Sequence, residues 1–125
     1  MPLEKTDIKD LHFEHTIWRN ELKFFKQEVS IFEKQLEKLV KETPAKDAMA
    51  QLEQFQNNFI RQKEVIDELS HHIKVHEREI SEREESNGGV FEDDIDQHLE
   101  MRDRMITFRK IYNELKNDFF QFLTK

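Results

Sequence analysis

Histidine is the residue type with the most chemical potential in this chain, which has no cysteine. The six histidines fall in three short stretches: His12 and His15; His71, His72 and His76; and His98. Imidazole nitrogens bind zinc, iron, copper and nickel, and an adjacent carboxylate suits iron, manganese or zinc. The chemistry that these residues indicate is metal binding, provided that the fold brings the three stretches together.

The elements that must position them are long helices. The chain of 125 residues has only 2 Gly and 2 Pro, and 38% of its residues are charged. Long stretches without a helix breaker are typical of an all-helical protein. Thr43-Pro44 is one break, because Thr is a good N-cap and Pro suits the first helical position. The second break, from Ser86 to Gly89, contains both glycines.

These breaks predict helices at about 7–42, 44–85 and 92–124 in a single domain that spans residues 1–125. Short connections make consecutive helices antiparallel. The expected fold is therefore all-α: an elongated up-down-up bundle of three helices with coiled-coil-like heptad packing.

Heptad patterning places some of the histidines in the core. Along each segment apolar residues alternate at spacings of three and four, which predicts one apolar seam per helix. His15, His76 and His98 occupy seam positions that other layers fill with Leu, Ile, Phe or Trp, and Asp94 is a further polar residue in the third seam. Antiparallel packing brings these positions to one layer near the glycine-containing turn.

This convergence predicts a metal site with His15, His76 and His98 as principal ligands, completed by Asp94, His72 or His12. His72/His76 and Asp94/His98 are each four residues apart on one helix, so each pair projects in one direction. Nearby carboxylates that would add ligands or orient the imidazoles are Glu14, Glu68 and Glu79. The expected ion is a divalent transition metal: zinc, iron or manganese.

Two other interpretations stay open. The histidines and Asp94 would also form a hydrogen-bonded cluster that responds to pH. Alternatively, the chain is a non-catalytic scaffold or interaction module with incidental histidines, because the terminal layers of bundles are partly wet. The sequence has no glycine-rich phosphate loop and no nucleophile elbow, so any enzymatic activity would depend on a metal.

Charge and patterning also bear on partners. A formal net charge of -7 without a block of Lys or Arg disfavours nucleic acid and anionic membranes. No apolar run approaches the roughly 20 residues of a membrane span, and the N-terminus lacks a secretory pattern, so a cytoplasmic location is expected. Apolar residues offset from the seams indicate either a wide core or a homodimer interface: Phe13, Ile17, Phe24 and Phe120.

Overall fold

A computed structural model describes residues 5–42, 46–86 and 92–124. It contains three helices, α1 (Lys5–Glu42), α2 (Lys46–Glu85) and α3 (Glu92–Leu123), and the described ranges contain no strand. The predicted helix start at Pro44 and both glycines of the second break lie outside these ranges. The protein is an all-α bundle of three helices, as the sequence predicts.

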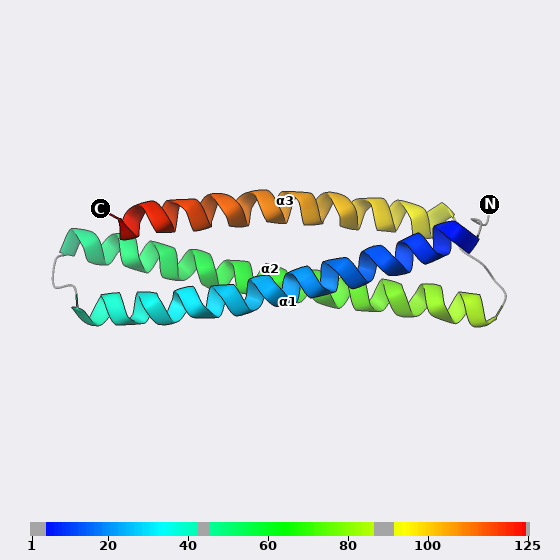
Figure 1. The fold of residues 1–125 in the computed structure, drawn as a ribbon, viewed down its shortest axis with the longest axis horizontal. Helices are drawn as coiled ribbons and strands as arrows, with labels where there is room; N and C mark the ends of the chain where they lie inside the picture. The colour runs from blue at the N-terminus through cyan, green and yellow to red at the C-terminus, as the bar shows by residue number, and fades with distance from the viewer. Residues whose placement is uncertain (1–4, 43–45, 87–91, 125) are drawn as a thin grey trace.

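The helices lie side by side along the whole length of the bundle (Figure 1), with α1 and α3 running in one direction and α2 in the other. Ion pairs between the helices agree with these directions. Glu14 pairs with Arg102 and Glu21 with Arg109, a constant separation of 88 residues that requires α1 and α3 to be parallel. The histidine-bearing ends of all three helices therefore meet at one end of the bundle.

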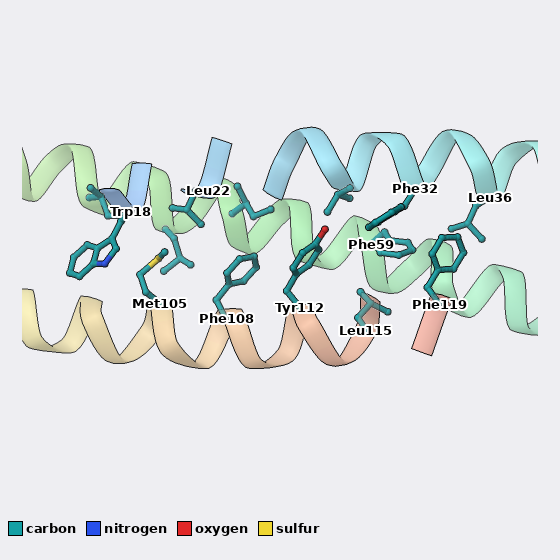
Figure 2. Packing of buried hydrophobic residues seen from close by; sticks show 14 of the residues in the cluster. Trp18, Leu22, Phe32, Leu36, Phe59, Met105, Phe108, Tyr112, Leu115 and Phe119 are labelled. Carbon is teal, nitrogen blue, oxygen red and sulfur yellow. The ribbon is translucent and has the colours of Figure 1, made fainter. Parts of the chain in front are cut away.

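The main core follows the predicted seams. Residues with no exposed surface include Leu22, Val29, Phe59, Ile73 and Met105. Figure 2 shows their row, from Trp18 beside Met105 to the rings of Phe32 and Phe119 further along the bundle. Phe59 and Phe119 pack edge to face at 5.2 Å between ring centroids, and each lies within 5.6 Å of Phe32. Aromatic contacts of this kind add stability beyond the area that they bury.

A second, smaller apolar cluster lies beyond the histidine positions. It contains buried Leu11 and Ile80, against which Ile8 and Ile95 pack. The bundle therefore has two apolar regions, and the polar layer described below lies between them along the seams.

The offset apolar residues are not covered by the core. Phe13 is 65% exposed and Phe24 56% exposed, and Ile17 and Phe120 are also classed as exposed. A wide core was one of the two explanations for these offset residues. It is wrong, because three helices bury little beyond their seams and the flanking positions. Within the described ranges, no helix has a stretch of the length and apolarity that a membrane crossing requires.

Candidate metal centre

Three imidazoles, one from each helix, meet in the interior. His15, His76 and His98 are 1%, 5% and 1% exposed. Nε2 of His15 lies 3.3 Å from Nδ1 of His76 and 3.2 Å from Nδ1 of His98. One potential ligand atom from each of the three residues lies within 4.8 Å of the other two. The three nitrogens are therefore close enough to one another that the group could hold one metal ion.

The location of this layer argues against a wet bundle end. Each histidine lies at a position that the apolar pattern of its helix predicts to face inward, and all three are buried. Leu11 and Ile80 cover the layer on the side of the chain turn, and Trp18 belongs to the main core on the other side. Burying polar side chains in such a place costs free energy unless they are paired.

Glu77 fixes the orientation of His15. Nδ1 of His15 donates a hydrogen bond of 2.7 Å to Oε2 of Glu77. Burial works to raise the pKa of the Glu77 carboxyl, but hydrogen bonds from His15 and His12 outweigh it and lower the pKa from 4.5. Burial lowers the pKa of His15 from 6.5 in spite of this carboxylate. At neutral pH a neutral imidazole therefore faces a charged carboxylate.

Glu14 fixes the orientation of His98. Nε2 of His98 donates a hydrogen bond of 2.7 Å to Oε1 of Glu14, and Arg102 holds the same carboxylate with bonds of 2.6 and 3.0 Å. Burial opposes ionisation of Glu14, but the hydrogen bonds from Arg102 and His98 lower its pKa. Burial lowers the pKa of His98 as well, against the effect of Glu14.

These two carboxylates decide which nitrogens carry protons. A neutral imidazole has one N–H and one lone pair. Nδ1 of His15 carries the N–H that donates to Glu77, so its Nε2 carries the lone pair. Nε2 of His98 carries the N–H that donates to Glu14, so its Nδ1 carries the lone pair. Two lone pairs therefore face each other across 3.2 Å. A cation between them would turn this repulsion into attraction.

The third histidine lacks such a carboxylate. Nε2 of His76 is buried and has no hydrogen-bond partner among the described residues. Burial lowers the pKa of His76, and the Asp94 charge and backbone oppose this shift only in part. An unpaired buried donor or acceptor costs about 1–3 kcal/mol. The presence of His76 in the core therefore costs free energy, and apolar packing alone does not explain why a histidine occupies this position.

His72 and His12 are not brought into this cluster, and Asp94 lies beside His76 but its carboxylate is not part of the group of three potential ligand atoms. The carboxylate of Asp94 is buried but forms an ion pair with Arg83. His72 is exposed. His12 is half-buried and contacts two carboxylates, Glu77 and Glu84. Hydrogen bonds to Glu84 and Glu77 outweigh the burial of His12 and raise its pKa, so that it favours the charged form.

Of the three predicted supporting carboxylates, Glu14 accepts a hydrogen bond from His98, and half-buried Glu79 acts on His76 only through its charge. Exposed Glu68 lies near Arg61. Glu77 was missed, although it follows His76 directly and occupies the flank of the α2 seam that faces α1. Trp18 was also missed as a neighbour of the site: its ring stacks on that of His98 at 4.8 Å between centroids. Its place in the seam one turn after His15 is the pattern that would have indicated it.

A surface groove lies beside His76. It lies between α2 and α3, has a volume of about 260 Å³ and is lined by buried His76 and Met101 and by exposed Glu100.

Comparisons of the chain with protein-family models, with curated proteins and with solved structures find no match. The class of protein is therefore defined by its own geometry: a three-helix bundle with a buried histidine triad that has the donor atoms for a metal ion.

Proposed function

We propose that this protein binds one divalent transition metal ion through His15, His76 and His98. The observation that carries the proposal is the pair of lone pairs fixed by Glu77 and Glu14, which face each other inside the bundle. Metal-bound histidines nearly always donate their other N–H to a carboxylate, a backbone carbonyl or water. Two of the three imidazoles already have a carboxylate acceptor.

Two of the three nitrogen separations fit a tetrahedral ion such as zinc. Four tetrahedral nitrogens at about 2.0–2.1 Å from zinc lie about 3.3–3.4 Å from one another, and Nε2 of His15 lies 3.3 and 3.2 Å from the Nδ1 atoms of His76 and His98. A ligand set of three imidazoles, with no carboxylate bound directly to the ion, also suits zinc better than manganese, which prefers oxygen ligands. Iron is the next candidate by the same donor set.

Three protein ligands leave a tetrahedral ion one further position. Sites with three protein ligands keep that position for water or substrate, whereas structural zinc sites are closed by four. The groove beside His76 offers a route to it. The proposed activity is therefore reversible binding of the ion with an exchangeable fourth ligand, and any catalysis would use that position.

Trp18 gives a direct test. It is the only tryptophan of the chain and it stacks on His98, so an ion bound to His98 changes its fluorescence. Titration of chelator-treated protein with zinc should give a saturating change at one ion per chain. His15→Phe should abolish the change, and His71→Phe, at an exposed position on α2, should preserve it. Wild-type fluorescence that does not respond to zinc, iron, copper or nickel, together with no retained metal, would contradict the proposal.

A further inference from the structure

The face between α1 and α3 has a layered arrangement. Three ion pairs join the two helices at its centre: Glu14 with Arg102, Glu21 with Arg109, and Glu28 with Lys116. Each pair links residues 88 positions apart. Positions on α1 and α3 that differ by about 88 are therefore level with each other along the bundle.

An exposed apolar row flanks the ion pairs on each helix. On α1, Ile17, Phe24 and Ile31 each lie three or four residues from a glutamate of the ion pairs. On α3, Leu99 and Ile106 stand in the same relation to the arginines. Residues at these spacings are neighbours on a helix surface. The rows therefore lie on the two sides of the line of ion pairs.

The ends of the rows extend this face. Phe13 precedes Ile17 by one turn on α1 and is the most exposed apolar side chain of the row. Phe120 continues the α3 row, with its ring 5.5 Å from that of Phe32 and Lys116 at 5.8 Å from its centroid. The two apolar rows thus extend from the end of the bundle that holds the three buried histidines to the end that holds the rings of Phe32 and Phe119.

We infer that this face binds a second copy of the chain. Seven large side chains, each about half exposed, present roughly 700 Å² per chain, close to the about 800 Å² per partner that a stable interface buries.

The charge of this face permits a copy of this chain as the partner. The net charge is -7, so most surfaces of two copies repel each other. On this face, however, the three acidic residues of the ion pairs are balanced by three basic ones. The face attracts neither a strongly basic nor a strongly acidic partner, and it lets two acidic chains approach.

Two pairs of apolar residues, one residue from each row, also lie at matching levels. Ile17 is level with Ile106, and Ile31 with Phe120, because their separations of 89 match that of the ion pairs to within one residue. A twofold axis along the bundle then places the α1 row of one copy over the α3 row of the other. An isologous dimer requires this reciprocity.

Sedimentation velocity of the full chain tests the inference. Wild-type protein at micromolar concentration should sediment at twice the chain mass of 15.3 kDa. Phe24→Glu and Ile106→Glu, one on each row, should each weaken the dimer at least about tenfold, because the symmetric interface carries every substitution twice. Their helical circular dichroism should be unchanged, since both residues are more than half exposed in one chain.

Ile60→Glu is the matched control, since Ile60 is an exposed apolar residue on α2 outside this face. It should leave the dimer intact. A wild-type monomer throughout the micromolar range would overturn the inference. A dimer that neither row variant weakens, or that Ile60→Glu weakens as much as they do, would overturn it as well.

Discussion

Replacing His76 by Leu should stabilise the metal-free protein and abolish the stabilisation that zinc gives. His76 occupies an apolar seam between Ile73 and Ile80, and its Nε2 is buried without a partner among the described residues. Leucine has a similar volume and no polar atom. Removing the unsatisfied nitrogen should therefore stabilise the metal-free protein by about 1–3 kcal/mol.

The same substitution removes one of the three proposed ligands. Zinc at a hundredfold excess over its dissociation constant should stabilise the wild-type protein by about 2.7 kcal/mol, because it binds only the folded state. For a chain of this size, 1 kcal/mol corresponds to roughly 3–6 °C in Tm. Zinc should therefore raise the wild-type Tm by roughly 8–16 °C and leave that of His76→Leu almost unchanged.

Thermal unfolding followed by far-ultraviolet circular dichroism, with chelator or with zinc, measures both effects. His72→Leu is the control, because His72 is exposed four residues earlier on the same helix, and it should keep the full response to zinc. A His76→Leu protein that is less stable than wild type without metal would refute the argument from the unpaired nitrogen. A preserved response to zinc would refute the assignment of His76 as a ligand.

Three further predictions follow from the contacts. Glu14→Gln should weaken zinc binding about 10–100-fold in the Trp18 titration, while Glu21→Gln, which breaks the analogous pair with Arg109, should not; equal losses would contradict the role of Glu14. Burial lowers the pKa values of all three triad histidines below 6.5 in the folded, metal-free protein. The unfolded chain therefore binds more protons than the folded chain as the pH falls below 6.5, and the free energy of unfolding should fall in that range. Urea unfolding across this range should show a smaller loss for His76→Leu than for wild type, and an equal loss would contradict the pKa argument. Tyr112→Phe removes a buried hydroxyl that donates to Glu28 at 2.6 Å and should cost about 1 kcal/mol in urea unfolding, so a neutral substitution would show that this bond contributes nothing.

The sequence was sufficient to predict the fold because its patterns are local. Two clusters of breakers and three seams of helical period determine helix number and the buried face of each helix. Convergence of His15, His76 and His98 followed from the same patterns, since short connections and long helices leave few ways to align the seams. Heptad positions thus carry information about distant contacts.

The surroundings of the triad were less predictable. His72 lies next to the seam and is four residues from His76, yet it is exposed, because side chains at seam-flanking positions turn toward solvent or inward according to a small helix rotation. The choice of Glu77 over Glu79 as partner of His15 depends on that rotation too. Arg83 was not anticipated as the partner of Asp94 because the pair forms across the chain turn.

X-ray absorption at the zinc edge tests the central claim most directly. Zinc-loaded protein should show four light ligands at about 2.0–2.1 Å, with the outer-shell scattering of three imidazoles and a water or other exchangeable ligand in the fourth position. His15→Phe should lose the bound zinc. A six-coordinate, oxygen-only shell, or imidazole scattering that is unchanged in His15→Phe, would contradict a metal centre formed by the three buried histidines.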